Sequence, residues 1–160
     1  MDIARHAVTR RSALRRALAA VAAALAGGWL PDATVRAAAL PPVTVWKDPN
    51  CGCCEGWVGH MRRTGFYVTV IASDDMTAVR QAHGVPDALQ SCHTAAVGGY
   101  VVEGHVPAAD VARLLAERPS ARGLAVPGMP AAAPGMDMAG DPYAVILFGT
   151  PAGDQPYAQH

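Results

Sequence analysis

Residues 43–63 read VTVWKDPNCGCCEGWVGHMRR. The β-branched and aromatic residues from Val43 to Trp46 predict a strand, which the proline turn at Asp48-Pro49 ends. A helix is predicted from Cys54 to Arg63, followed by Gly65 at its end. The three cysteines of Cys51-Gly52-Cys53-Cys54 are therefore predicted to lie in the connection between a strand and a helix, and at the start of that helix.

Strands and helices continue to alternate after this stretch. The predicted elements are a buried strand at Phe66 to Ala72, a helix from Ser73 to His83, strands at Thr94 to Val97 and Tyr100 to His105, a helix from Pro107 to Glu117, and a final strand at Tyr143 to Phe148. This order predicts a single α/β domain with a thioredoxin-like mixed sheet flanked by helices. Residues 123–142 are rich in Pro, Gly and Met, which predicts a loop rather than a second domain.

The first 39 residues have the composition of an export signal. A run of arginines precedes an apolar stretch from Ala17 to Leu30, and Ala37-Ala38-Ala39 supplies the small residues that a signal peptidase needs. The apolar run is about 14 residues, shorter than the roughly 20 that span a bilayer. We therefore expect residues 1–39 to be cleaved, with no permanent membrane span. Thr9 to Arg15 also resembles a twin-arginine signal, so the Tat and Sec routes both stay open.

Removal of this leader changes the balance of charge. It takes away six of the 13 basic residues but only two of the 13 acidic ones, which leaves seven basic and eleven acidic residues. An acidic chain without a basic patch argues against binding to nucleic acid. The remaining residues 40–160 are enough for one compact domain.

The position of the cysteine motif favours metal or redox chemistry. The N-terminus of a helix stabilises anions, so thiolates form there more readily than in free cysteine. Adjacent thiolates repel one another unless a cation or a disulfide removes charge, and thiolates select Cu(I), with zinc and iron–sulfur clusters as competitors. Two alternatives remain: a redox disulfide, or a structural bridge from Cys51 or Cys53 to Cys92, which an oxidising compartment would favour.

A predicted hairpin places a second group of ligands. If Gly98-Gly99 forms a two-residue turn, counting outward sets Cys92 opposite His105, and opposed residues share a face. We expect Cys92, His93 and His105 to converge on one rim that faces the Cys51 to Cys54 loop.

Methionines in the proline-rich stretch are further candidates. Met129 lies in Gly128-Met129-Pro130, and Met136 and Met138 follow it. A thioether in a loop either fills a gap in the core or ligates Cu(I). The other histidines are predicted to be solvated or to lie at helix or chain ends: His60, His83 and His160.

Three segments resemble the CopG-type periplasmic copper-resistance protein family, formerly a domain of unknown function. They are WKDPNCGCCEGWVGHM, GVPDALQSCHTAAVGGYVVEGHVPAADVARLL and GLAVPGMP, and the resemblance covers about Val43 to Phe148. It implies a thioredoxin-like fold, a periplasmic location, a part in copper resistance, and redox chemistry on copper. It also implies copper bound at four ligands: Cys51, Cys53, Cys54 and Cys92. That His93, His105 and Met129 complete the site is inferred from this sequence.

The function predicted first is therefore an exported copper-binding protein. Four clustered thiolates exceed what one Cu(I) needs, so several bridged ions and cycling between Cu(I) and Cu(II) are expected. The alternative is a thiol–disulfide oxidoreductase in which Cys51 and Cys54 form the active pair and Cys92 resolves mixed disulfides. A passive carrier would use the same ligands, so enzymatic turnover stays open. Expected partners are copper ions and other periplasmic copper-handling proteins.

Overall fold

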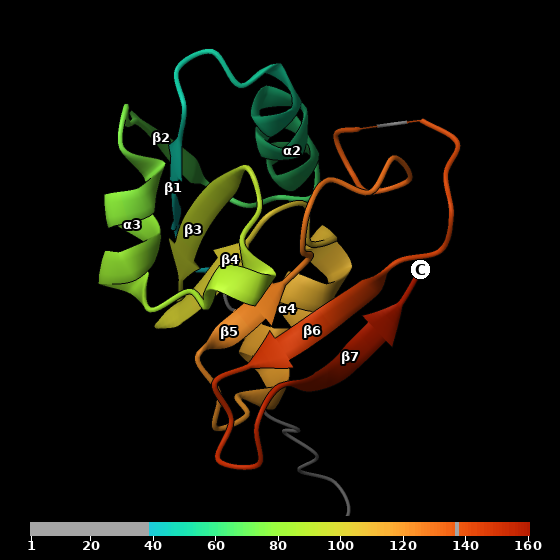
Figure 1. The fold of residues 1–160 in the computed structure, drawn as a ribbon. Coiled ribbons are helices and arrows are strands. Elements are labelled where there is room, and N and C mark those ends of the chain that lie inside the picture. Colours follow the sequence, from blue (N-terminus) through green and yellow to red (C-terminus); the bar gives the residue numbers. More distant parts are fainter. Residues whose placement is uncertain (1–38, 137) are drawn as a thin grey trace, which may run out of the picture. The chain divides into compact units, whose positions relative to one another are not determined.

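The structure, a computed structural model, describes residues 39–136 and 138–160. Residues 1–38 of the predicted export signal lie outside the described residues. The described chain folds around one mixed sheet of seven strands in the order β2-β1-β3-β4-β5-β6-β7 (Figure 1). The predicted α/β class is thus confirmed, while the name thioredoxin-like remains an interpretation of the order of elements.

The first half of the sheet follows the predicted order. β1 (Val43–Lys47) pairs in parallel with β2 (Val68–Ala72), and α2 (Gly52–Arg63) connects them. β3 (His93–Val97) runs antiparallel to β1 and continues into β4 (Tyr100–Glu103). Between β2 and β3 lie α3 (Met76–His83) and the 3₁₀ turn η1 (Asp87–Leu89).

The second half contains the predicted strand at Tyr143 to Phe148, which is β6, and two strands that were not predicted, β5 and β7. After α4 (Ala108–Glu117), β5 (Gly123–Ala125) pairs in parallel with β4, and β6 (Ala144–Phe148) runs antiparallel to β5. β7 (Gln155–Gln159) forms the outer edge. The predicted loop at 123–142 is therefore shorter than expected, because its first three residues belong to β5.

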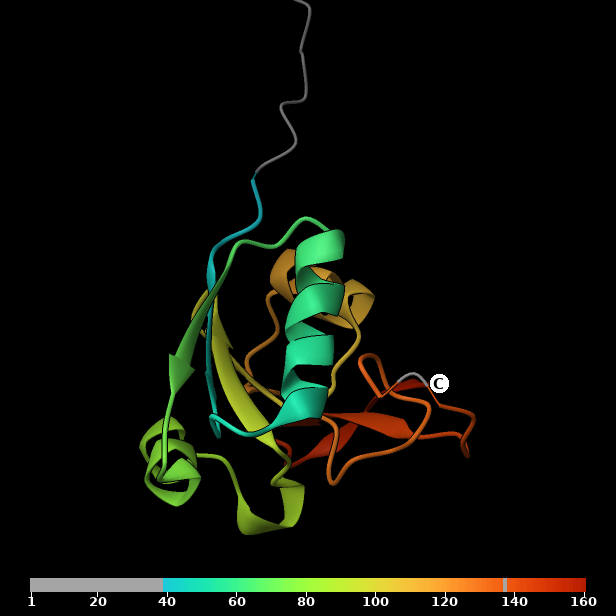
Figure 2. The same cartoon turned by 90° about the horizontal axis from the view of Figure 1, so that it is seen from above.

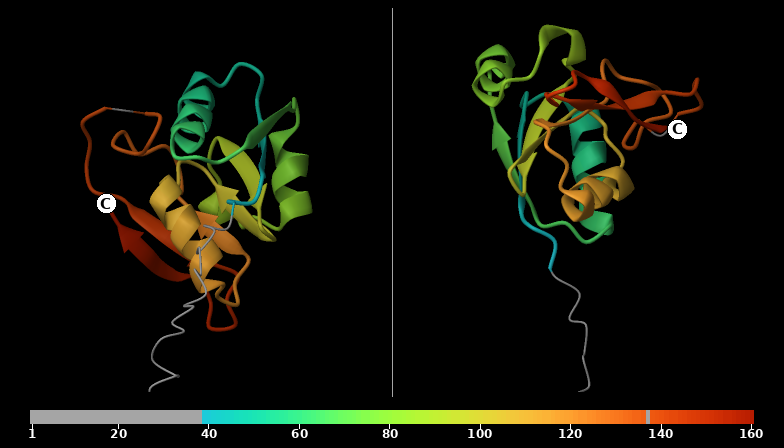
Figure 3. Two further views of the ribbon diagram at one scale, coloured as in Figure 1. Left: turned by 180° about the vertical axis from the view of Figure 1, so that it is seen from behind. Right: turned by 90° about the horizontal axis from the view of Figure 1, so that it is seen from below.

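Helices cover both faces of the sheet. α2 and α4 lie side by side on one face, and α3 lies on the other (Figures 2 and 3). α2 buries Cys54, Trp57, Val58 and Met61, a spacing of three and four residues that sets one helical face on the core. Their partners are alternate residues of β1, whose Val43 and Val45 are buried. The N-terminus of α2, with its cysteines, is therefore anchored by the core.

α2 begins earlier than predicted. The helix starts at Gly52 rather than at Cys54, and Cys51 occupies the N-cap position. Cys53 and Cys54 consequently lie in the first turn, where backbone N–H groups have no partner within the helix. Among the described residues, no helix combines the length and the apolar character needed to cross a membrane.

Candidate metal centre

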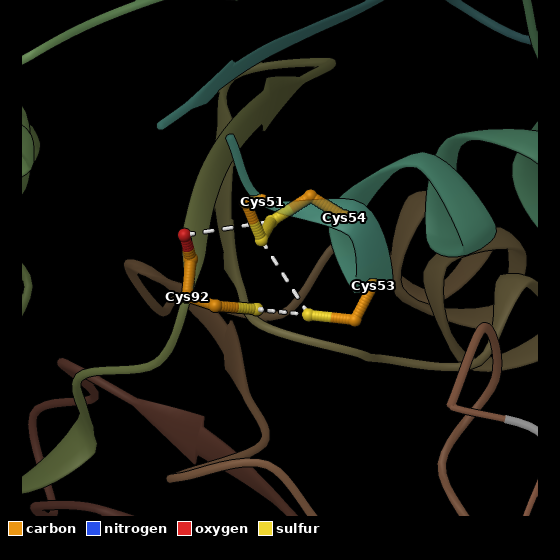
Figure 4. A group of neighbouring side chains, drawn as sticks. All are labelled: Cys51, Cys53, Cys54 and Cys92. Carbon is orange, nitrogen blue, oxygen red and sulfur yellow. Dashed lines mark hydrogen bonds between the residues drawn. A yellow bond between two sulfur atoms is a disulfide. The ribbon is translucent and has the colours of Figure 1, made fainter. Parts of the chain in front are cut away.

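Four cysteine sulfurs gather where β1 leads into α2 (Figure 4). The Sγ atoms of Cys51, Cys53, Cys54 and Cys92 all lie within 4.8 Å of one another. Cys53 Sγ is 3.4 Å from Cys51 Sγ and 3.9 Å from Cys92 Sγ. Cys92 reaches the group because β3 pairs with β1, which sets His93 opposite Lys47 at the point where the cysteine loop begins. The predicted gathering of the four cysteines is therefore present in the fold.

Two of these cysteines form a disulfide. Cys51 is bonded to Cys54, and Cys53 and Cys92 are free. The structural bridge from Cys51 or Cys53 to Cys92 is therefore wrong for this state. The pairing instead joins the two ends of the Cys-x-x-Cys segment, whose Cα atoms lie 5.5 Å apart within one helical turn.

A second group shares one cysteine with the first. Cys92, His93 and His105 also place their ligand atoms within 4.8 Å of one another. Cys92 Sγ lies 3.0 Å from His105 Nε2 and 3.4 Å from His93 Nδ1. The register Thr94↔Glu103 confirms the predicted two-residue turn, and the same count sets Cys92 opposite His105. The two groups meet at Cys92 and form one continuous cluster of soft and imidazole ligands.

Burial tunes the protonation of these side chains. Burial lowers the pKa of His93 to about 3, aided by the neighbouring His105, and burial lowers the pKa of His105 as well. Burial, followed by the neighbouring Cys53, raises the pKa of Cys92 to about 12. The imidazoles are thus neutral, the form that binds metals, and the Cys92 thiol keeps its proton until a cation displaces it.

One ring nitrogen of the cluster has no protein partner. Among the described residues, His93 Nε2 is the buried side-chain polar atom that makes no hydrogen bond. The His93 ring lies at a tilt against the ring of Trp57, with centroids 4.4 Å apart, and Trp57 Nε1 donates to Val106 O. A buried nitrogen left unpaired costs free energy unless something binds it. The nitrogen that faces Cys92 Sγ is instead Nδ1. The thiols and neutral imidazoles of the two groups are donors that soft metal ions accept, so the donor set fits a metal ion.

Glu103, which the sequence analysis did not select, holds the backbone of the residue that precedes Cys92. Its fully buried carboxylate accepts from Ser91 N at 2.8 Å and from Thr94 Oγ1 at 2.6 Å. Arg80 pairs with the same carboxylate at 3.2 Å and also donates to Ser91 O. The residue before Cys92 is thus fixed from both sides. The available signal was a single acid within the apolar strand YVVE.

Lys47, also missed, holds the start of the cysteine loop. Its side chain is buried, and Nζ donates to Asp48 O and Pro49 O. It also pairs with Glu55 in the first turn of α2 at 3.1 Å. One ammonium therefore ties the two ends of the loop together. The signal was a lysine that ends an otherwise apolar strand.

The remaining predicted residues lie outside these two groups. Met129 is 58% exposed, so its role as a ligand stays a prediction. His60 Nε2 accepts from Ala108 N at 3.1 Å and caps the start of α4. The His83 ring packs at a tilt against Trp46, and His160 pairs with Asp110 at 2.7 Å.

Known proteins are similar to this chain in fold and in sequence. The family described as "Protein of unknown function, DUF411" matches residues 89–136. Two solved structures, "Copper resistance protein copG- Form 1" and its Form 2, are 44% and 43% identical, with TM-scores of 0.70 and 0.71. Each alignment covers 76% of this chain and 98% of the other. No curated protein matches the chain.

The fold and the cluster define a class of small α/β proteins with a cysteine–histidine site at the start of the first helix after β1. The two solved structures described above narrow this class to one family. At this identity and coverage, the chain belongs to the CopG family of copper resistance proteins.

Proposed function

We propose that this protein is exported to the periplasm and binds Cu(I) there as part of copper resistance. The observation that carries the proposal is the approach of four cysteine sulfurs to within 4.8 Å. Thiolates are the ligands that Cu(I) prefers over harder donors. Both similar solved structures are of proteins named copper resistance proteins, which supports copper over zinc as the cargo.

The cluster is suited to more than one ion. Cys92 belongs to both the all-cysteine group and the group with His93 and His105. A sulfur shared in this way can bridge two copper ions, and four thiolates exceed what one Cu(I) needs. The imidazoles favour Cu(II) more than thiolates do, which supports Cu(I)/Cu(II) cycling at the mixed end of the cluster.

Loading requires reduction of the Cys51–Cys54 bond. Two electrons and two protons convert the disulfide to two thiols, and each thiol that binds Cu(I) then releases its proton. A cellular thiol reductant of the compartment is the source of the electrons. The oxidised form offers only Cys53 and Cys92 as thiols.

The decisive experiment is a count of bound copper. After anaerobic reduction and loading with Cu(I), the purified protein is expected to retain more than one copper per chain against a moderate chelator. Elemental analysis and thiol titration give the ratio. Retention of one copper or fewer per chain by protein in which thiol titration finds all four cysteines reduced would contradict the proposal.

One observation favours a second function. The Cys51–Cys54 disulfide at the start of α2, with the free Cys92 nearby, is the arrangement that a thiol–disulfide oxidoreductase uses. Such an enzyme needs no third thiol between the active pair. Cys53 therefore discriminates between the two functions.

His105→Ala is expected to weaken copper retention and to bias the bound copper toward Cu(I), because an imidazole favours Cu(II). His60→Ala is the control. Loss of its bond to Ala108 N should lower thermal stability without any change in copper retention. Anaerobic copper titration and potentiometry of both variants measure the difference. Wild-type copper behaviour in His105→Ala would remove His105 from the site.

A further inference from the structure

A segment distant in sequence packs against the candidate metal centre. Residues 128–136, in the orange part of the chain, lie beside the N-terminal turns of α2 (Figure 2). Near the start of the segment, Gly128 N donates to Gln90 O at 3.1 Å, and Ser91 Oγ donates to Gly128 O. The segment is thus tied to the residues that immediately precede Cys92.

The same segment makes a hydrogen bond to His105. The Nδ1 atom of His105 lies 2.7 Å from Pro134 O. A carbonyl oxygen only accepts, so Nδ1 carries the hydrogen, and in the neutral ring Nε2 is then left with its lone pair. That lone pair faces Cys92 Sγ at 3.0 Å, where the thiol donates to it. Pro134 therefore selects the tautomer that leaves Nε2 able to bind a metal.

Two glycines permit this approach. A Cβ atom on Gly56 would lie 2.9 Å from the Cα of Gly135 and closer still to the Gly135 carbonyl oxygen. A Cβ atom on Gly135 would lie 2.6 Å from the carbonyl carbon of Gly56 and closer still to Trp57 N. These are backbone atoms, which cannot rotate away as a flexible side chain does. Any side chain at Gly56 must push the segment off α2.

We propose that Gly56 and Pro134 are positioning residues for the metal centre. Close backbone contact between Gly56 and Gly135 holds the Pro134 carbonyl on His105 Nδ1, and this hydrogen bond presents the bare Nε2 to Cys92 and to copper held there. The copper part of this inference rests on the proposed function. The tautomer part concerns the protein without metal.

The test compares two glycines on the same helix. Gly56→Ala should displace the segment, whereas a Cβ on Gly59 meets only the mobile end of Arg63, at 3.2 Å. Imidazole ¹⁵N NMR of the metal-free protein is expected to show His105 protonated at Nδ1 in the wild type and in Gly59→Ala. In Gly56→Ala, Nδ1 is expected to lose this protonation preference, and affinity for Cu(I) to fall by about 10-fold or more.

Two results would overturn the proposal. One is a wild-type His105 protonated at Nε2, and the other is a Gly56→Ala spectrum identical to that of Gly59→Ala. If Gly56→Ala fails to fold, the wild-type protein provides the test. Scalar coupling between His105 Nδ1 and the Pro134 carbonyl carbon, transmitted through their hydrogen bond, is then expected, and its absence would overturn the proposal. If none of the proteins binds copper, the proposed function fails while the tautomer result stands by itself.

Discussion

Cys53→Ser is expected to lower the copper retained per chain to about one ion or fewer, because a serine hydroxyl is a poor ligand for Cu(I). Cys53 Sγ lies 3.4 Å from Cys51 Sγ and 3.9 Å from Cys92 Sγ, so it contacts both. Its loss therefore removes one of the four thiolates from the cluster. The fold should remain intact, since Cys53 is only half-buried while the adjacent Cys54 is fully buried. Copper-to-protein ratios after anaerobic loading measure the effect.

Gly52→Ala is the matched control for this variant. A Cβ at Gly52 meets no atom within 4 Å, so copper retention should stay at the wild-type value. The contrary outcome is equally clear. If Cys53→Ser binds copper normally, and if reduction of insulin disulfides depends on Cys51 and Cys54, the oxidoreductase function replaces the copper-binding one.

Glu103→Ala is expected to destabilise the protein by about 3–5 kcal/mol, the range for breaking a buried ion pair from one side. The change leaves the guanidinium of Arg80, largely shielded from water, without its carboxylate. It also removes the acceptor of Ser91 N and Thr94 Oγ1. Urea unfolding of the metal-free protein gives the free energy of unfolding.

An exposed acid provides the comparison for Glu103. Glu117 pairs with Arg113 on the surface of α4, so Glu117→Ala should leave the urea midpoint nearly unchanged. Glu103→Gln retains part of the hydrogen bonding and should fall between the wild type and Glu103→Ala. Equal midpoints for the Glu103 and Glu117 alanine variants would show that the buried network contributes little.

Local signals were sufficient to predict the order of elements in the first half of the fold, but the predicted burial of the strand at Phe66 to Ala72 is wrong, because β2 is an edge strand with mostly exposed residues. The strand, proline turn and helix of residues 43–63 depend on neighbouring residues, and the Gly98-Gly99 turn fixes the pairing that brings Cys92 to His105. β7 was missed because Gln155–Gln159 is polar and contains Pro156. A proline is tolerated there because β7 is an edge strand, paired to β6 through an irregular register.

The supporting residues of the site could not be predicted in the same way. Lys47 and Glu103 are buried charges, and only the assembled sheet shows which groups compensate them. The Cys51–Cys54 pairing likewise depends on α2 starting at Gly52, two residues earlier than its pattern suggests. Contacts between residues 128–136 and α2 join segments about 75 positions apart, a separation at which local pattern carries no information.

The Gly98-Gly99 turn also determines which insertions and deletions the chain tolerates. Cys92 lies six positions from this turn, about 20 Å along an extended strand. Adding one residue to the turn would nevertheless shift the register of β3 against β4 by one residue. Such a slip reverses the face of the sheet on which each side chain lies. The length of this surface turn is therefore as important for the site as the identity of the ligands, because a change in either would remove Cys92 from its place opposite His105. The loop between Phe148 and Gln155 has more freedom to vary in length, because it joins β6 to the edge strand β7 and neither strand carries a proposed ligand.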